Sequence, residues 1–222
     1  MKPKRTIEDH LEIEDLLREE YFELLPIVRC LAMQLETEIR SLALSILQNL
    51  RPYEQLVVKS RVKECESALN RLLGPKEGRT FDPDKPGGYS LLQLPDMAGV
   101  RVLVFPNSRL IQVDDALRIR FADWTPKPLE YGSRSAQVRK YIGYCDEVSR
   151  EVRGEYQVAP MLLGLFWEVE NDAMYKFRAA ANSKDMRNHR TIVEDSLISF
   201  EKGMESFVRD NIGKFPENPS QN

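Results

Sequence analysis

Apolar residues recur at helical spacing toward both ends of the chain and at strand spacing in between. Residues 13–50 are predicted to form helices, which end at the dipeptide Arg51-Pro52 because proline disfavours continued helix. One face is marked by apolar residues four, three, four and four positions apart: Leu35, Ile39, Leu42, Ile46 and Leu50. This stripe predicts a helix packed against a core.

The middle of the chain alternates extended segments with shorter helices. Short β-branched runs predict strands near residues 55–60, 99–105, 139–145 and 154–158. A helix is predicted to begin near Val62 and to end at Gly74-Pro75, and another spans residues 110–120. Between Gly74 and Leu92 the chain is rich in Gly, Pro and Asp, which predicts a loop.

Two helices are predicted after the last strand. Pro160 is well suited to the first position of a helix that runs to Ala180. We expect its apolar residues to pack on the sheet: Leu162, Leu165, Phe166, Val169 and Ala173. A final helix spans residues 185–211, and we expect its apolar residues to pack against the domain or a second copy of the chain: Ile192, Leu197, Ile198, Phe200, Met204 and Phe207.

Together these elements predict an α+β fold with a mixed β-sheet core flanked by helices and with helical additions at both termini. The expected division is a helical segment at residues 1–50, a domain at residues 51–182, and a helix and tail at residues 183–222. Either terminal helix could support a homo-oligomer.

Composition narrows the class of protein. The 222 residues are 42% apolar, which suffices for a buried core, and the net charge of −3 argues against non-specific coating of nucleic acid. The uncharged run at residues 158–167 is too short to span a membrane, and no apolar signal-peptide core is present near the N-terminus. Three cysteines without a Cys-x-x-Cys pair suggest free thiols in the cytoplasm.

A basic segment stands out in this acidic chain. Residues 59–79 contain six basic and three acidic residues. Within it Lys63, Ser67 and Arg71 are four positions apart, so on a helix they form one polar ridge that could face a polyphosphate. Taken alone, the ridge is more typical of a solvated basic surface than of a binding site.

Two carboxylates lie beside predicted strands. Asp96 comes just before a strand, where a carboxylate can hold Mg²⁺, although a turn residue after Pro95 is the commoner alternative. Glu155 and Gln157 are two residues apart on another strand, so both project to one face. A carboxylate there could complete a metal site or accept a proton from an attacking hydroxyl.

A third pattern lies between these carboxylates. In Lys140-Tyr-Ile-Gly143-Tyr144 the second tyrosine offers a flat face for a purine ring, and the lysine offers charge to phosphates. The alternative is a strand whose Tyr141 and Tyr144 simply pack. Lys85-Pro-Gly-Gly88-Tyr89-Ser90 is a second candidate loop of similar composition.

The order of these motifs resembles the synthetase domain of the RelA/SpoT family, whose enzymes move pyrophosphate from ATP to the 3′-hydroxyl of a guanine nucleotide. The resemblance covers about residues 50–178 and rests on residues 61–71, 94–102, 140–144, and 155–157 followed by 166–176. In the family the acceptor loop lies between the metal aspartate and the catalytic glutamate. That order selects residues 140–144 and not the loop at residues 85–90.

The resemblance assigns a role to each matching residue. It implies that Asp96 and Glu155 hold Mg²⁺ and are catalytic. It implies ATP binding by Arg61, Lys63, Ser67, Arg71 and Arg101, and acceptor binding by Lys140, Gly143, Tyr144 and Gln157. The expected product from GDP or GTP is (p)ppGpp.

Two departures from the family keep alternatives open. Val148 stands where the family has a histidine, and Glu170-Asn171 stands where Glu-His is common. A toxin-type relative that pyrophosphorylates the 3′ end of tRNA or makes adenine alarmones is one alternative, favoured by a basic patch of Arg134, Arg139, Arg150 and Arg153 around Lys140. The other is a nucleotide-binding regulator without turnover.

Overall fold

The computed structural model describes residues 7–47, 51, 53–73, 89–127, 138–144, 152–175 and 184–211. The helices are α1 (Ile7–Leu47), α2 (Cys65–Leu73), α3 (Leu110–Arg120), α4 (Met161–Tyr175) and α6 (Lys184–Asn211), with short 3₁₀ turns at Leu91–Gln93 and Asn107–Arg109. The strands are β1 (Gln55–Val62), β2 (Ala98–Phe105), β3 (Thr125–Pro126), β4 (Arg139–Gly143) and β5 (Gly154–Pro160).

The strands form one mixed sheet in the order β1-β2-β5-β4-β3. The central pair, β2 and β5, is parallel, and every other neighbouring pair is antiparallel. All four predicted strands are present, and the two-residue β3 adds an edge that the sequence pattern did not predict. The predicted α+β class is confirmed.

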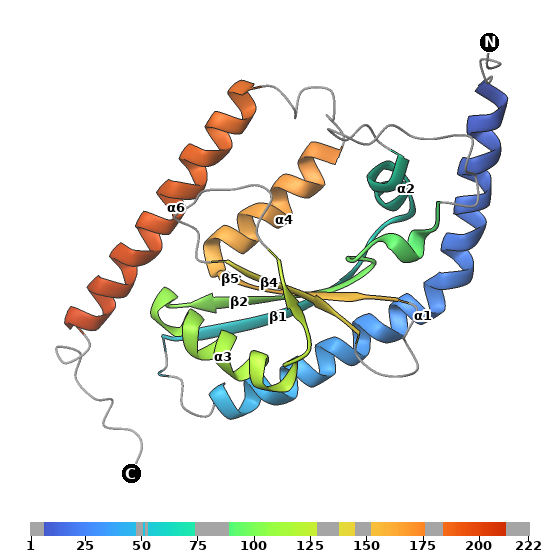
Figure 1. Ribbon diagram of the computed structural model, residues 1–222. Coiled ribbons are helices and arrows are strands. Elements are labelled where there is room, and N and C mark those ends of the chain that lie inside the picture. Colours follow the sequence, from blue (N-terminus) through green and yellow to red (C-terminus); the bar gives the residue numbers. More distant parts are fainter. Residues whose placement is uncertain are drawn as a thin grey trace, which may run out of the picture.

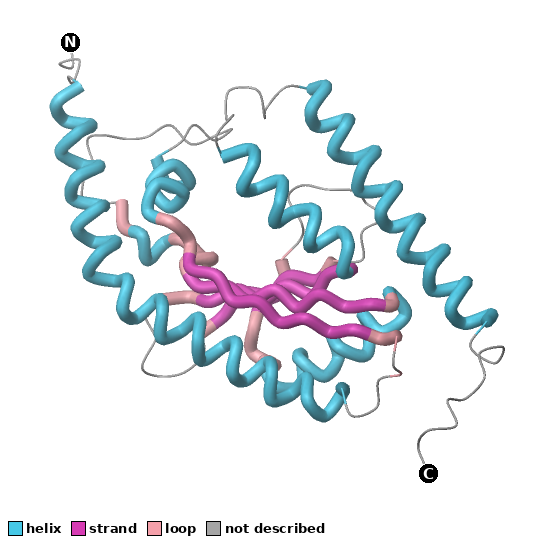
Figure 2. The backbone as a smooth tube through the Cα atoms, turned by 180° about the vertical axis from the view of Figure 1, so that it is seen from behind, coloured by secondary structure: helices cyan, strands magenta, loops and turns pink. Residues whose placement is uncertain are grey.

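Helices cover both faces of the sheet. Figure 1 shows α1 and α3 below the sheet and α4 above it, with α6 lying outside α4, and the same layers are visible from behind in Figure 2. The lower layer buries the larger core, in which Val28, Leu31 and Leu35 of α1 join Tyr156 and Val158 of the central strand.

The N-terminal region is one helix, not several. α1 is 41 residues long and continues without a break through Pro26. Proline normally breaks a helix because it lacks a backbone N–H, but the buried stripe runs on across it, with Leu24 at 8% and Val28 at 0% exposure. The predicted stripe from Leu35 to Ile46 is confirmed as a core face, while Leu50 lies outside the described residues.

The predicted packing face of α4 is confirmed only in part: Phe166 packs at the margin of a buried cluster and Leu162 is half-buried, while the side chain of Ala173 lies outside the described residues. Leu165 and Val169 are 38% and 68% exposed, whereas Leu163 and Trp167 face inward at 0% and 6%. The cause is a close approach at Gly164, where a Cβ atom would lie 2.1 Å from Cδ2 of Leu103 on β2. The helix can sit this near the sheet only with glycine turned toward it, which fixes its rotation.

α6 packs against the domain, as expected, but with an unexpected face. Its inward positions are Glu194, Ile198 and Glu201, each less than 5% exposed, and they face α4. Phe200 and Phe207 lie on the outer side at 59% and 64% exposure. None of the described helices is both long and apolar enough to be a candidate membrane span.

Candidate active site

Polar side chains from four neighbouring strands meet on the face of the sheet that α4 covers. Pairing places Lys59, Arg101, Gln157 and Lys140 in one row across β1, β2, β5 and β4. Residues opposite one another in a sheet share a face. Contacts identify this face as the one under α4, since Lys59 binds Glu168 at 2.6 Å and Arg101 approaches the carbonyl of Gly164 at 3.3 Å.

Asp96 and Lys63 form an ion pair at the edge of this face. The Lys63 ammonium is 2.8 Å from Oδ2 of Asp96. The prediction that Lys63, Ser67 and Arg71 form a ridge on one helix was wrong, because α2 begins at Cys65. The backbone N–H of Lys63 instead donates to the carbonyl of Met97 at 2.9 Å, which extends the β1–β2 pairing and holds the lysine beside the aspartate.

The environment of Asp96 suits a cation ligand. Burial alone would raise its pKa, but Lys63, with Arg61 and Lys140 nearby, holds the pKa of this carboxyl below its usual value. It is therefore ionised at neutral pH. Its second oxygen, Oδ1, is buried and has no hydrogen-bond partner within the described part of the chain. A free buried carboxylate oxygen is the donor type that Mg²⁺ prefers.

Glu155 is the most enclosed carboxylate of the site, with a side chain 2% exposed. Lys140 contacts one oxygen at 2.6 Å, and the side-chain amide of Gln157 donates to the other at 2.5 Å. The lysine that the resemblance assigned to acceptor phosphates thus lies against the predicted catalytic carboxylate. Lys140 reaches Glu155 diagonally, because it lies opposite Gln157 in the β4–β5 pairing and Glu155 is two residues away on the same face.

The two carboxylates lie at the same end of neighbouring parallel strands. Asp96 precedes β2 by two residues, Glu155 is the second residue of β5, and Gly99 pairs with Glu155. Among the described residues no group of three or more His, Cys, Asp or Glu side chains gathers as a metal site. A metal held here would therefore take its remaining ligands from phosphate oxygens and water, as Mg²⁺ commonly does.

Arg101 lies under α4 with a side chain only 11% exposed. Burial and the neighbouring Arg61 lower the pKa of Arg101 to about 10, while Glu168 and Glu155 oppose that shift. It still carries its charge at neutral pH. Arg61 and Arg101 thus place two guanidinium groups near each other, an arrangement suited to an anionic ligand.

The end of β4 presents Tyr144 at the surface. Its side chain is 46% exposed, and its carbonyl accepts a hydrogen bond of 3.2 Å from Nε1 of Trp124. Gly143 has a packing role on the opposite face, because a Cβ atom there would lie 2.5 Å from the Trp124 ring. The loop at residues 85–90 is described only at Tyr89 and Ser90, and Tyr89 packs partly buried against the core.

Seven of the predicted site residues form a gathered set. Contacts and electrostatic interactions connect the gathered set: Arg61, Lys63, Asp96, Arg101, Lys140, Glu155 and Gln157. Ser67 and Arg71 share one face of α2, with side chains of intermediate exposure. The side chains of Asn171 and Tyr175, and the whole of Val148, lie outside the described residues.

Sequence reasoning gave no site role to Lys59, Gly164 or Glu168, and it placed Trp167 on the helix behind the catalytic strand without assigning it a role. Lys59 precedes Arg61 by two residues and so shares its face on β1, but the predicted strand ended at Ser60, one residue short of Arg61. Glu168 has no such signal. Its contact with Lys59 joins residues 109 positions apart and depends on how α4 is rotated.

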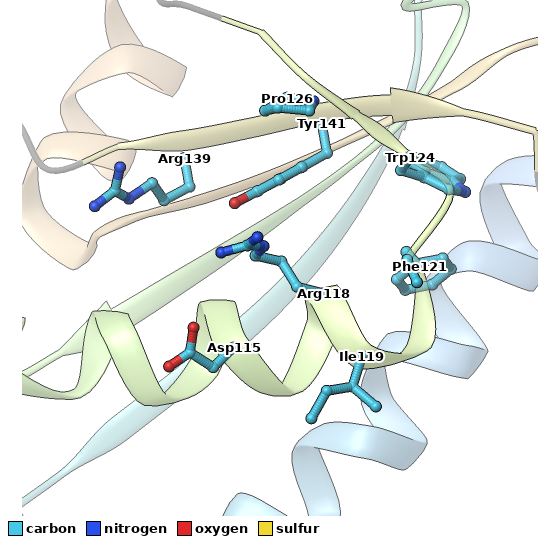
Figure 3. Close-up of a pocket in the computed structure, with 9 residues that line it drawn as sticks. Asp115, Arg118, Ile119, Phe121, Trp124, Pro126, Arg139 and Tyr141 are labelled. Atoms are coloured by element: carbon cyan, nitrogen blue, oxygen red, sulfur yellow. The ribbon is translucent and has the colours of Figure 1, made fainter.

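The expected basic patch around Lys140 does not form among the described residues. Arg139 points to the opposite face of the sheet, where it lines a hollow of about 750 Å³ with Arg118, Tyr141 and Trp124 (Figure 3). Lys140 is paired with Glu155, and Arg153 donates to the carbonyl of Gln93 at 2.7 Å. Arg134 and Arg150 lie outside the described residues.

Comparison with known proteins connects this arrangement to solved folds. No protein-family model and no curated protein matches the sequence. The structure is similar to small alarmone synthetase 1 from Bacillus subtilis bound to its product pppGpp, with a TM-score of 0.63 and 17% identity over 88% of this chain and 99% of that one. The form of that protein bound to AMPCPP gives a TM-score of 0.59 at 16% identity, over 89% and 100% of the two chains.

A protein from another organism has a similar structure. A GTP pyrophosphokinase family protein from Streptococcus pneumoniae matches with a TM-score of 0.59 and 20% identity, over 88% of this chain and 95% of that one. The matches extend well beyond the motif-bearing residues. The chain therefore has the fold of the small alarmone synthetases and of GTP pyrophosphokinase family proteins, as the order of its motifs led us to expect.

Proposed function

We propose that this protein is a Mg²⁺-dependent pyrophosphokinase that transfers the β,γ-pyrophosphate of ATP to the 3′-hydroxyl of GDP or GTP and so makes (p)ppGpp. One observation carries the proposal. Two buried carboxylates, Asp96 and Glu155, lie at the same end of parallel neighbours β2 and β5, each paired with a lysine and close to Arg61 and Arg101. Carboxylates and cations in this arrangement suit a metal–polyphosphate ligand.

The reaction joins the acceptor 3′-oxygen to the β-phosphorus of ATP and breaks the bond between that phosphorus and the oxygen bridging to the α-phosphorus. AMP leaves, and the hydroxyl proton passes to Glu155. When bound, Mg²⁺ would neutralise charge on the transferred group, with Asp96 and Glu155 as its protein ligands. Catalysis would come mainly from alignment and charge neutralisation.

The two lysines have a second task in this mechanism. Lys63 and Lys140 neutralise Asp96 and Glu155 in the structure. When a metal takes over that neutralisation, each ammonium becomes available to phosphate oxygens. Lys63 would then contact the donor ATP together with Arg61, Arg101, Ser67 and Arg71, and Lys140 would contact the acceptor phosphates.

Tyr144 supports a nucleobase acceptor. Its side chain is exposed directly after β4, the strand that carries Lys140. Aromatic rings in such positions stack on bases with little dependence on sequence. The solved relatives bound to AMPCPP, an ATP analogue, and to pppGpp are consistent with nucleotide ligands. With ATP and GTP as substrates, the protein would act in the cytoplasm.

The test is transfer of label from γ-labelled ATP in separate reactions with GDP, GTP, ATP and deacylated tRNA. We expect label in guanosine tetra- or pentaphosphate, with Mg²⁺ required and Asp96→Asn as the inactive control. Label on tRNA or on an adenine nucleotide would reassign the acceptor. Nucleotide binding without any transfer would instead identify a regulator.

A further inference from the structure

The polar contacts of the Arg101 guanidinium are long for a buried cation. Its Nε is 3.3 Å from Oε1 of Gln157, its Nη1 is 3.3 Å from the carbonyl of Gly164, and Glu168 is 4.0 Å away. All three contacts are at the long end for charged groups, which usually approach to about 2.7–2.9 Å. Arg61 adds repulsion, which contributes to the lowered pKa of Arg101.

An aromatic ring provides the missing support. The Arg101 guanidinium carbon is 5.8 Å from the ring centroid of Trp167, within the range of a cation–π interaction. The ring is 6% exposed, so the interaction is shielded from water. Where Trp167 lies therefore affects where the guanidinium lies.

Trp167 is held in turn by the C-terminal helix. Its indole Nε1 donates to Oε1 of Glu194 on α6 at 2.7 Å. Glu194 has 0% exposure, and it also accepts from Nε of Arg190 at 3.0 Å. Arg190 reaches across to Glu170 of α4 at 3.1 Å, so the carboxylate is fixed from both helices.

A buried carboxylate is a costly way to join two helices. The surrounding contact is apolar, formed by Leu163, Trp167 and Ile198 with Phe166 and Val138 at its margin. Burying a charge in such a place rarely improves stability over an apolar side chain of similar size. A carboxylate does supply what an apolar residue lacks, a strong acceptor that orients the indole ring.

We infer that Glu194 is a positioning residue for the candidate active site: through Trp167 it sets the place of Arg101, so that α6 shapes the donor side of the site. The inference deepens the proposed function and rests on it. It connects a residue of the last helix with an arginine of β2 through one hydrogen bond and one cation–π contact.

ATP affinity gives the first test. Glu194→Ala and Trp167→Phe should each weaken ATP binding by about threefold to tenfold, the range expected when a cation–π contact is misplaced, while KM for the acceptor stays unchanged. Glu194→Gln keeps an acceptor for the indole and should restore affinity to within about twofold. Ile198→Ala is the matched control, because it loosens the same helix contact without touching the hydrogen bond.

A double-mutant cycle separates positioning from packing. If Glu194 acts through Arg101, adding Glu194→Ala to Arg101→Ala should not weaken ATP binding further. Additive losses would overturn the inference, and so would a lowered melting temperature in Glu194→Ala with unchanged ATP affinity. An equal loss of affinity in Ile198→Ala would also overturn it.

The position of the ring can be measured without nucleotide. The chain has two tryptophans, so in a Trp124→Phe background Trp167 alone emits when it is excited at the long-wavelength edge of tryptophan absorption, where tyrosine does not absorb. Glu194→Ala should raise the acrylamide quenching constant of Trp167 by about twofold or more, and Glu194→Gln should not. Unchanged quenching would overturn the inference whatever the nucleotide chemistry. A wild-type protein with the expected quenching pattern but no ATP binding would instead count against the proposed function alone.

Discussion

The ammonium nitrogen of Lys63 lies 2.8 Å from a carboxylate oxygen of Asp96, and each side chain is only 13% exposed. The pair joins the residue after β1 to the turn before β2, and the backbone of Lys63 bonds to Met97 beside it. The contact fixes the position of a predicted metal ligand. It also has a direct consequence for stability.

Lys63→Met should destabilise the fold at pH 7 by about 3 kcal/mol, because it leaves the Asp96 carboxylate buried without its partner. The folded-state pKa of Asp96 is lowered, so the stabilisation is present above the unfolded pKa of about 4 and is lost as pH falls through the folded value. Urea unfolding should therefore show the largest difference between variant and wild type near neutrality and a shrinking one below pH 4.

Lys59→Met is the matched control for that measurement. Its ion pair with Glu168 has side chains 44% and 30% exposed. Such pairs are screened by water and typically contribute about 1 kcal/mol or less. An equal cost for both substitutions would mean that the Lys63–Asp96 contact behaves as an ordinary surface pair.

Asp96→Asn and Glu155→Gln should each lower transfer by about 100-fold or more with the fold intact, since each removes a charge and little volume. Initial rates with saturating ATP and acceptor, alongside circular dichroism spectra, provide the check. Glu168→Gln changes a carboxylate on the same face that contacts Lys59, and we expect a much smaller loss. Near-normal turnover in either of the first two variants would remove that carboxylate from the mechanism.

Sequence patterns predicted the sheet well because strands and their ends carry local signals. The β-branched runs and the Pro and Gly residues that bound them located β1, β2, β4 and β5 to within a few residues. The carboxylates could be found for the same reason, since Asp96 and Glu155 lie at strand ends. What the pattern could not provide was the rotation of α4, which depends on one tertiary contact between Gly164 and Leu103.

The partners of the charged residues could not be predicted from the local sequence either. The spacing of Lys63, Ser67 and Arg71 fits a helix, but pairing of the Lys63 backbone with Met97 delays the helix start to Cys65. Likewise α6 has more apolar residues on its outer side than on its inner side, so a count of apolar positions did not show that Glu194 and Glu201 join Ile198 on the face packed against the domain. The buried Glu194 accepts a hydrogen bond from Trp167 of α4, and Oε1 of the buried Glu201 accepts one from the backbone N–H of Leu162.

Glu201→Gln should stabilise the protein at neutral pH. Burial raises the pKa of Glu201, although the backbone N–H of Leu162 and the side chain of Asn107 oppose the shift. A raised folded pKa means that the favourable contribution is complete below the unfolded value and is lost as pH rises through the folded one. Glutamine still accepts the hydrogen bond from Leu162 without a buried charge.

Unfolding free energies measured from pH 4 to pH 8 would show this. The wild type should lose stability relative to Glu201→Gln as pH rises, and the gap should be widest above the raised pKa. A gap that is constant with pH would contradict a titrating Glu201, as would a variant that is less stable at pH 7. Glu205→Gln, on the same helix with intermediate exposure, is a suitable control.

The outer side of α6 is the expected contact for a second copy of the chain. Phe200 and Phe207 are 59% and 64% exposed, and Ile192, at 61%, lies on the same side of the helix. Exposed apolar stripes of this kind are typical of protein interfaces. We predict that Phe200→Ser with Phe207→Ser lowers the molar mass measured by light scattering, and that truncation before Lys184 gives insoluble or dissociated protein because it also uncovers Trp167.

Two results would contradict self-association through α6. One is an unchanged mass in the double serine variant, and the other is a monomeric wild type at micromolar concentration. Ser199→Ala changes a neighbouring exposed position without reducing apolar surface and should leave the mass unaltered. A soluble, active truncation with an unchanged number of subunits would rule out a role of the helix in covering Trp167 and in self-association.

Tyr144 gives the sharpest test of the acceptor site. If its exposed ring stacks on the acceptor base, Tyr144→Ala should lose about 1–3 kcal/mol of acceptor interaction while ATP affinity stays nearly normal. Tyr144→Phe keeps the aromatic face and should lose little. The tyrosine carbonyl that binds Trp124 belongs to the backbone, so neither substitution removes that hydrogen bond.

The readouts are KM for GDP and GTP, ATP affinity, and melting temperature, measured for both variants. A loss of acceptor affinity in alanine but not in phenylalanine, at constant melting temperature, is the signature of stacking. Tyr89 is no neutral comparison, because its side chain packs against the core and its removal should lower stability. If Tyr144→Ala left KM for both nucleotides unchanged, guanine recognition at the end of β4 would lose its main support, and the labelled-ATP reactions with adenine nucleotides and tRNA would become the deciding measurement.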